Sequence, residues 1–192
     1  MNLSPRFSEA LSYACEIHQG QIRKGTAIPY IAHLLGVTGI ALEYGADEDQ
    51  AIAALLHDAA EDAGGEPRLQ NIRRRFGQRV ADYVRACTDT VESPKPPWRE
   101  RKEAYIAHIA SADPAALLIS AADKLHNARN ILKDFRATGD AVWSRFNGGK
   151  DGTLWYYRAL VVAFRKVIPS DLVEELDRVV SEIERLARCT ST

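Results

Sequence analysis

The sequence contains few cysteines and no long apolar run. Its cysteines, Cys15, Cys87 and Cys189, are far apart and form no CxxC pair, so neither a zinc knuckle nor a redox pair is expected. An odd, scattered set is typical of reduced thiols in a cytoplasmic protein. No apolar stretch approaches the roughly 20 residues of a membrane span, and residues 1–6 lack the apolar core of a signal peptide. We therefore expect a cytoplasmic protein with no membrane partner.

The sequence also lacks an excess of charge of either sign. Lys and Arg total 25 and Asp and Glu total 26, which gives a net charge of −1. Proteins that bind nucleic acids usually show a clear basic excess, so no nucleic-acid partner is expected. A local basic pocket for a small phosphorylated ligand is still compatible with this balance. The chain has 192 residues, of which 46% are hydrophobic, and this predicts one globular domain over residues 1–192.

Helical periodicity runs through almost the whole chain, with few strand-like alternations. Helices are expected to begin at Ser4-Pro5, after Asp47 and at Asp113-Pro114, which are typical capping sequences. The expected helices cover residues 4–20, 29–45, 47–64, 67–76, 78–88, 98–110, 113–135, 154–167 and 170–187. Residues 92–97 are expected to form a loop and residues 148–152 a polar break, because they are rich in proline and glycine, respectively. The predicted fold class is an all-α, single-domain helical bundle.

The most informative residues end the apolar third helix, where the sequence reads H-D-A-A-E-D over residues 57–62. Burial of unpaired charge is costly, and the imidazole of His57 and the carboxylate of Asp58 suit a divalent transition metal. Glu61 and Asp62 each lie four residues after one member of this pair, one helical turn further on. There they would serve as acid–base groups beside a metal-bound water. The alternative is an acidic run that is solvated at a helix end.

Two residues on other predicted helices complete a possible metal site. His33 lies on the preceding helix, and Asp123 lies within an otherwise apolar helix, where a carboxylate needs a partner. A lone histidine is more often an ordinary core or surface residue. Together with His57 and Asp58, however, these residues form a set of two histidines and two carboxylates contributed by three helices.

The order H…HD…D resembles the signature of the HD hydrolase superfamily. Arg23-Lys24, Pro29-Tyr30, the H-D-A-A-E-D run and the sequence A-D-K-L-H-N over residues 122–127 are most similar to the hydrolase domain of the RelA/SpoT family, in particular its small stand-alone alarmone hydrolases. This resemblance implies an HD-type bundle whose motif core covers residues 21–135 and whose helices over residues 153–188 complete it. It also implies removal of the 3′-pyrophosphate from ppGpp and pppGpp, which yields GDP or GTP and pyrophosphate, with one Mn²⁺ ion as cofactor.

The resemblance also implies roles for individual residues. The implied metal ligands are His33, His57, Asp58 and Asp123. Glu61 and Asp62 would orient or deprotonate the attacking water. The implied contacts with the guanosine nucleotide substrate are Arg23, Lys24 and Asn127, with Lys124 and Asn130 as further candidates.

Several alternatives remain open at the level of sequence. Long RelA/SpoT enzymes have one residue fewer between the basic pair and the first histidine, so base recognition by the loop over residues 25–28 is open. A chain of 192 residues leaves no room for the synthetase domain of the long enzymes, so alarmone synthesis is not expected. Other HD enzymes act on NADPH or on nucleoside monophosphates. An idle nucleotide-binding module is a further alternative, although such modules usually lose a ligand or the acidic pair.

Three other features have two interpretations each, and a fourth, His18, has one. His126 is expected to pack in the core or to support the metal site, and His18 is expected at the surface. The segment over residues 94–102, which contains Trp98, either covers the active site or is an ordinary loop. The aromatic residues 155–157 either line the nucleotide pocket or pack in the core.

Overall fold

The computed structural model describes residues 2–62, 64–88, 94 and 96–189. In these ranges the elements are α1 (Pro5–Ile17), α2 (Ile31–Glu43), α3 (Glu48–Leu56), α4 (Ala59–Asp62), α5 (Gly65–Phe76), α6 (Gln78–Cys87), α7 (Trp98–Ile109), α8 (Pro114–Thr138), the 3₁₀ helix η1 (Gly139–Arg145), α9 (Gly149–Val167) and α10 (Asp171–Cys189). The β pairing within them is an isolated bridge between Ile22 and Pro29. The prediction of an all-α fold is confirmed. None of the described helices has the length and apolarity to cross a membrane.

Capping side chains explain why helices begin where the sequence predicts. Ser4 accepts a hydrogen bond from the Arg6 N–H at 3.2 Å, and Asp113 caps α8 in the same way. At the start of α3, the Asp47 carboxylate accepts from the Gln50 N–H at 2.9 Å while the Gln50 side chain accepts from the Asp47 N–H at 2.8 Å. This reciprocal pair satisfies two N–H groups that the helix leaves unpaired. A cap of this kind stabilises a helix by about 1 kcal/mol.

The prediction of one continuous helix over residues 47–64 is wrong. The helix α3 ends at Leu56, His57 and Asp58 form a turn, and α4 follows with a single helical turn. The cause is local, because the His57 ring lies with Nδ1 2.8 Å from the Ala54 carbonyl oxygen. In an uninterrupted helix that carbonyl accepts from the Asp58 N–H. The i+4 relation resumes at once, since the Asp62 N–H donates to the Asp58 carbonyl at 3.0 Å.

The expected break at residues 148–152 is also not observed, because α9 begins at Gly149 and continues through these residues. The glycines there serve close packing. A Cβ atom on Gly148 would lie 2.5 Å from Cη2 of Trp98, and one on Gly152 would lie 3.2 Å from the same atom. The absence of side chains therefore lets the indole at the start of α7 lie directly on the start of α9.

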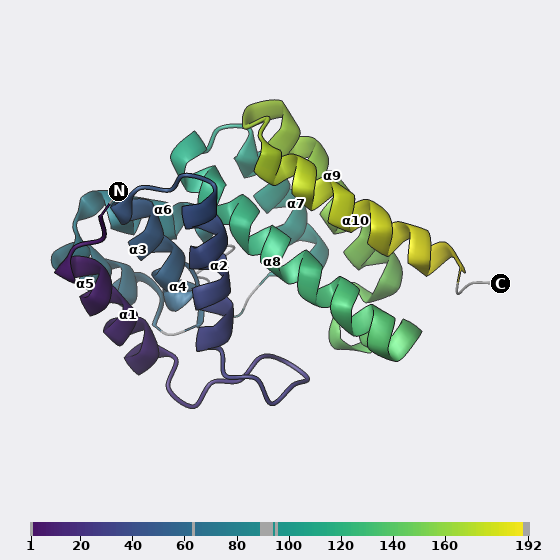
Figure 1. The fold of residues 1–192 in the computed structure, drawn as a ribbon, viewed down its shortest axis with the longest axis horizontal. Coiled ribbons are helices and arrows are strands. Elements are labelled where there is room, and N and C mark those ends of the chain that lie inside the picture. Colours follow the sequence, from purple (N-terminus) through teal and green to yellow (C-terminus); the bar gives the residue numbers. More distant parts are fainter. Residues whose placement is uncertain (1, 63, 89–93, 95, 190–192) are drawn as a thin grey trace.

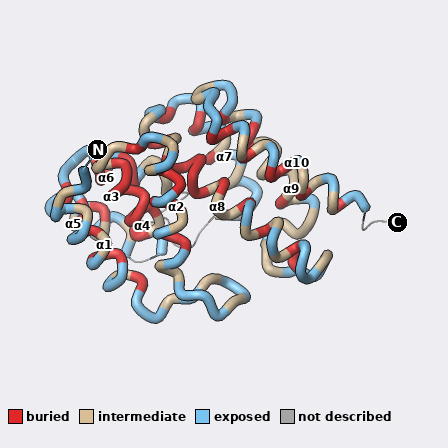
Figure 2. The backbone as a smooth tube through the Cα atoms, viewed as in Figure 1, coloured by how far each residue is buried: buried red, intermediate tan, exposed pale blue. Residues whose placement is uncertain are grey.

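The helix α3 occupies the centre of the N-terminal half. Every residue from Gln50 to Leu56 is buried, and α3 packs against α1, α2 and α6. The long helix α8 runs through the middle of the molecule (Figure 1) and packs against α2, α6, α10 and η1. Figure 2 shows the buried segments concentrated where these helices meet. His57, which directly follows α3, therefore lies in the interior and is only 2% exposed.

Candidate functional site

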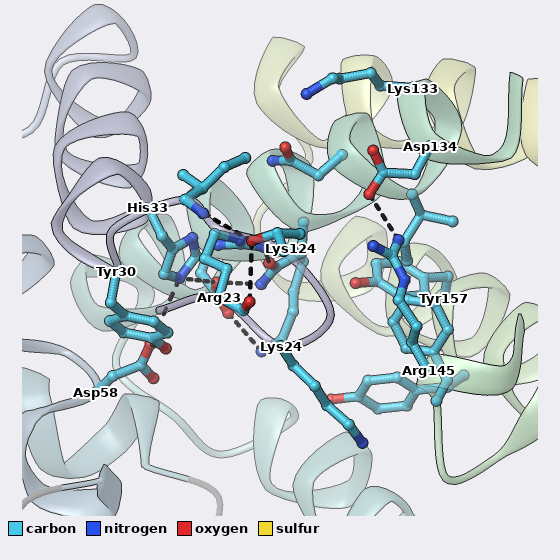
Figure 3. Close-up of a pocket in the computed structure, with 18 of the residues that line it drawn as sticks. Arg23, Lys24, Tyr30, His33, Asp58, Lys124, Lys133, Asp134, Arg145 and Tyr157 are labelled. Carbon is cyan, nitrogen blue, oxygen red and sulfur yellow. Dashed lines mark hydrogen bonds and ion pairs between the residues drawn. The ribbon is translucent and has the colours of Figure 1, made fainter. Parts of the chain in front are cut away.

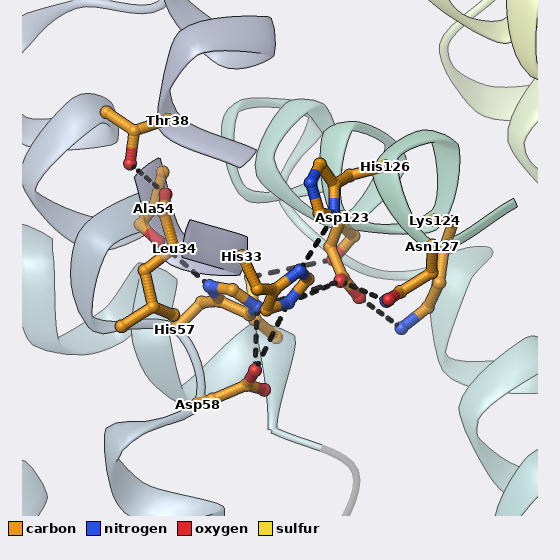
Figure 4. Close-up of polar contacts among 12 residues, drawn as sticks. His33, Leu34, Thr38, Ala54, His57, Asp58, Asp123, Lys124, His126 and Asn127 are labelled. Carbon is orange, nitrogen blue, oxygen red and sulfur yellow. Dashed lines mark hydrogen bonds and ion pairs between the residues drawn. The ribbon is translucent and has the colours of Figure 1, made fainter. Parts of the chain in front are cut away.

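Two histidines and two aspartates from three parts of the chain meet beside α8 (Figure 4). Nε2 of His33, on α2, lies 3.2 Å from Oδ1 of Asp123 and 3.5 Å from Oδ2 of Asp58. Nε2 of His57, in the turn after α3, lies 3.7 Å and 3.0 Å from the same two oxygens. The structure thus brings together all four residues that the sequence suggests as metal ligands.

The orientation of His57 leaves a lone pair facing two carboxylates. Its Nδ1 lies 2.8 Å from the Ala54 carbonyl and can only donate there, so in the neutral ring Nε2 carries no proton. That Nε2 is buried and has no hydrogen-bond partner among the described residues. Lone pairs and anionic oxygens repel one another unless a cation lies between them. The donor atoms of His33, His57 and Asp58 all lie within 4.8 Å of one another. This donor set therefore fits a divalent transition metal.

The electrostatics of the cluster point to the same requirement. Burial opposes ionisation of Asp58 and Asp123, but nearby imidazoles and, for Asp123, the Lys124 ammonium outweigh it, so both pKa values lie well below their usual range. Burial also opposes protonation of His57, but the two carboxylates raise its pKa well above the ordinary value. Two ionised carboxylates at a largely buried site need a positive charge beside them. A divalent ion bound among these side chains would supply that charge.

Tyr30 contacts the Asp58 carboxylate beside the histidines. Its hydroxyl donates to Oδ2 at 2.5 Å, and burial together with the Asp58 charge raises the pKa of the phenol. The Tyr30 ring stacks on His18 at a centroid distance of 5.1 Å. His18 is only 4% exposed, so the expectation of a surface histidine is wrong. No local pattern signals this contact, because it depends on how residues 18–30 fold back against α2.

Lys124 and Asn127 contact Asp123 directly. Lys124 Nζ lies 2.7 Å from Asp123 Oδ2, and Asn127 Nδ2 donates to Asp123 Oδ1 at 2.6 Å. The oxygen of the Asn127 amide accepts from Arg23 Nη2 at 2.9 Å. Asn127 thus lies on the same helical face as Asp123, as the spacing predicts. It also connects Asp123, a metal-ligand candidate, to the basic side chain of Arg23.

A cavity of about 360 Å³ opens beside the cluster (Figure 3). All five residues that the sequence suggests for substrate binding line it, namely Arg23, Lys24, Lys124, Asn127 and Asn130. Three further cations, Lys102, Lys133 and Arg145, line the same space. The acidic residues in the lining are Asp58, Asp123 and Asp134, of which Asp134 is paired with Arg145 at 2.6 Å. The walls therefore carry a positive excess although the protein as a whole is almost neutral, which favours an anionic ligand.

Glu61 and Asp62 lie on α4, directly after the His57-Asp58 turn. Neither is among the described residues that line the cavity. Asp62 is exposed, and its Oδ2 accepts from Gln21 Nε2 at 2.8 Å. The oxygen of the Gln21 amide lies 2.6 Å from Nδ1 of His18. The two acidic residues thus follow the metal-ligand candidates directly in the chain, and the Asp62 carboxylate is held by Gln21, which the sequence does not single out.

The aromatic residues over 155–157 divide between the two interpretations. Tyr156 and Tyr157 line the cavity. Trp155 instead packs with Trp98, at a centroid distance of 6.3 Å, and under the Arg99 guanidinium. Of the loop expected over residues 92–97, residues 92, 93 and 95 lie outside the described residues, and Lys102, which follows this loop on α7, reaches the cavity wall.

Comparison with known proteins gives concordant matches. A family profile described as "HD domain" matches residues 10–154. The guanosine-3′,5′-bis(diphosphate) 3′-pyrophosphohydrolase MESH1 of Xenopus tropicalis is 39% identical over 128 residues, which cover 65% of this chain and 69% of that protein. The human protein of the same name is 35% identical over 126 residues, 64% and 68% of the two chains. A solved structure, described as a metazoan ortholog of SpoT that hydrolyzes ppGpp and plays a role in starvation responses, has a TM-score of 0.79 and 29% identity and covers 95% of this chain and 97% of its own.

Proposed function

The chain belongs to the HD-domain family, and from this premise we propose that it hydrolyses the 3′-pyrophosphate of guanosine 3′,5′-bis(di)phosphates. The products are GDP or GTP and pyrophosphate. One observation carries the proposal most directly: the cluster of His33, His57, Asp58 and Asp123 adjoins a cavity with basic walls. A metal site alone is common to many hydrolases, whereas this combination suits a nucleotide with several phosphates. The curated relatives that bear this activity in their names support the same substrate.

The cavity supports binding of a nucleotide of this kind. Its volume of about 360 Å³ lies within the range of about 300–1,000 Å³ typical of small-molecule sites. Arg23 and Lys24 enter it from the loop before α2, and Lys133 and Arg145 from α8 and η1 (Figure 3). A guanidinium can stack on a base or pair with two phosphate oxygens, and an ammonium acts as a point charge on a phosphate. The residues on opposite walls can thus hold the two ends of one polyphosphorylated ligand.

The residues that would hold the metal are His33, His57, Asp58 and Asp123, and we propose Mn²⁺ as the ion. When bound there, such an ion lowers the pKa of a coordinated water and offsets charge on the phosphoryl oxygens. Tyr30 supports this set, since its hydroxyl donates to Asp58 Oδ2 at 2.5 Å.

The acidic pair on α4 supplies the acid–base group. We assign Glu61 and Asp62 to orient the attacking water and to accept its proton. The water attacks the phosphorus atom bonded to O3′, the O3′–P bond breaks, and O3′ takes up a proton as pyrophosphate leaves. The Gln21 amide donates a hydrogen bond to Oδ2 of Asp62. This leaves Oδ1 of Asp62 as the oxygen that can accept the proton. A general base positioned in this way contributes about 10²- to 10⁴-fold to a hydrolysis rate.

Two further features belong to the proposal. We propose that residues 1–192 form one HD phosphohydrolase domain, because α10 and η1 pack on α8 and α9 supplies Tyr156 and Tyr157 to the cavity. We also propose that the enzyme works in the cytoplasm, where its three free cysteines would stay reduced. The proposed partner is the small-molecule nucleotide alone.

The test is pyrophosphate release by the purified protein from ppGpp, NADPH and a nucleoside monophosphate, with and without Mn²⁺. Mn²⁺-dependent release of pyrophosphate from ppGpp supports the proposal. Release of phosphate from NADPH or the nucleoside monophosphate, with no release from ppGpp, would show that the proposed substrate is wrong. The variant Asp123→Asn, which keeps the shape of the side chain, should lose turnover. Asp151→Asn, at an exposed position on α9 outside the cavity lining, is the matched control and should retain it. Equal turnover by the two variants would contradict the assignment of the site.

A further inference from the structure

His126 makes a direct contact with one of the metal-ligand candidates. Its Nδ1 lies 2.9 Å from Nδ1 of His33, and the two ring centroids are 4.8 Å apart. Figure 4 shows the His126 ring on α8 directed at His33, on the side away from Asp58. His126 is half-buried and is not among the described residues that line the cavity. Its contact is therefore with the metal-site cluster and not with a nucleotide in the cavity.

A hydrogen bond between two imidazole nitrogens requires that one of them carries a proton and the other does not. If His126 donates, a neutral His33 carries its proton on Nε2, which then points at the carboxylates of Asp58 and Asp123. If His33 donates, its Nε2 presents a lone pair to the same space, 3.2 Å from Asp123 Oδ1. Only the second arrangement leaves His33 able to bind a metal. His57 is already arranged in this way by the Ala54 carbonyl.

The surroundings of His126 keep it in the role of acceptor. The side-chain nitrogen of Asn130, which can only donate, lies 3.3 Å from Nδ1 of His126, so this ring nitrogen faces a donor on that side as well. The ring is also closely packed on the side that faces α2. A Cβ atom on Gly36 would lie 2.4 Å from both Cδ2 and Nε2 of His126, so the ring fits against α2 only because residue 36 has no side chain.

We propose that His126 is a positioning residue of the metal site: it accepts a hydrogen bond from Nδ1 of His33 and thereby leaves Nε2 of His33 as the ligand nitrogen. The inference rests on the metal site of the proposed function and extends it to a residue that touches neither metal nor substrate. Partners that fix the tautomer of a ligating histidine typically contribute about 10- to 100-fold to metal affinity or activity.

The test compares His126→Asn with His126→Leu in the full chain. The two side chains have nearly the same shape, but only asparagine offers an acceptor oxygen close to the position of Nδ1. Titration calorimetry with Mn²⁺ and no nucleotide should show an affinity about 10- to 100-fold below wild type for the leucine variant and a much smaller loss for the asparagine variant. Equal losses in the two variants would reduce His126 to a packing residue, and wild-type affinity in the leucine variant would exclude any role.

A second measurement needs no variant. In ¹⁵N-labelled wild-type protein loaded with diamagnetic Zn²⁺, the proton shared by the two rings should be bonded to Nδ1 of His33 and show coupling to Nδ1 of His126. A proton bonded to Nδ1 of His126 or to Nε2 of His33 would overturn the inference. Because both measurements are made without nucleotide, inactivity toward ppGpp would count against the proposed function alone.

Discussion

Two glycines on α2 provide a matched test of how tightly this helix approaches α8. A Cβ atom on Gly36 would lie 2.4 Å from the His126 ring, whereas one on Gly39 would meet nothing within 4 Å. Replacing a helical glycine by alanine stabilises an exposed helix by about 1 kcal/mol. The variant Gly39→Ala should show this gain. In Gly36→Ala the same gain is offset by overpacking, which typically costs about 1–3 kcal/mol.

The difference between the two variants isolates the clash with His126. A difference of about 1–3 kcal/mol corresponds to roughly 2–12 °C in melting temperature for a domain of this size. Thermal unfolding followed by circular dichroism measures it without knowledge of the substrate. Mn²⁺ affinity should fall in Gly36→Ala, because the displaced His126 ring no longer holds His33, and should stay at the wild-type value in Gly39→Ala. Equal melting temperatures and equal Mn²⁺ affinities in the two variants would refute the packing argument.

Three further predictions address other parts of the account. Gln21→Leu should lower kcat by up to about 100-fold, because the Asp62 carboxylate that Gln21 holds would be misplaced, and should leave Mn²⁺ affinity in calorimetry unchanged. The variant of an exposed neighbour, Gln19→Leu, should behave as wild type, and equal kcat values for the two variants would refute the role of Gln21. Arg23→Ala should raise KM for ppGpp about tenfold or more, since a hydrogen bond to a charged group contributes about 1.5–3 kcal/mol, whereas exposed Arg73→Ala should not. Burial raises the pKa of Tyr105 to about 12, so this phenol stays neutral in the folded state while it ionises in the unfolded chain above about pH 10, and the free energy of unfolding should fall from there by about 1.4 kcal/mol per pH unit on its account. In urea unfolding at pH 9 to 11, the free energy of unfolding of Tyr105→Phe should fall less steeply with pH than that of the wild type, and equal slopes would refute the shift.

Much of the fold follows from local sequence. The cap at Asp47 and the apolar residues after it predict where α3 begins and that it is buried, because both signals depend on neighbours along the chain. The end of the same helix was not predicted. It depends on the contact of the His57 ring with the Ala54 carbonyl, a competition between side chain and backbone that composition does not reveal.

The site divides in a similar way. His33, His57, Asp58 and Asp123 could be selected because ionisable residues in apolar helices require an explanation, and the structure brings them together. Among the groups that contact them, His126 is expected from the sequence as one possible support of the metal site, whereas the contact of Tyr30 could not be predicted. The hydroxyl of Tyr30 reaches Asp58 only because the loop before α2 folds back, and these contacts join residues far apart in the chain.

Cleavage of ppGpp in ¹⁸O-labelled water tests the central claim most directly. The products, separated and analysed by ³¹P NMR and mass spectrometry, identify both the substrate and the bond that breaks. With Mn²⁺ present we predict GDP together with pyrophosphate that carries the ¹⁸O label, and no product after removal of the metal by a chelator. Label in the 3′-hydroxyl of GDP, release of orthophosphate in place of pyrophosphate, or an intact nucleotide in the presence of Mn²⁺ would each contradict the account.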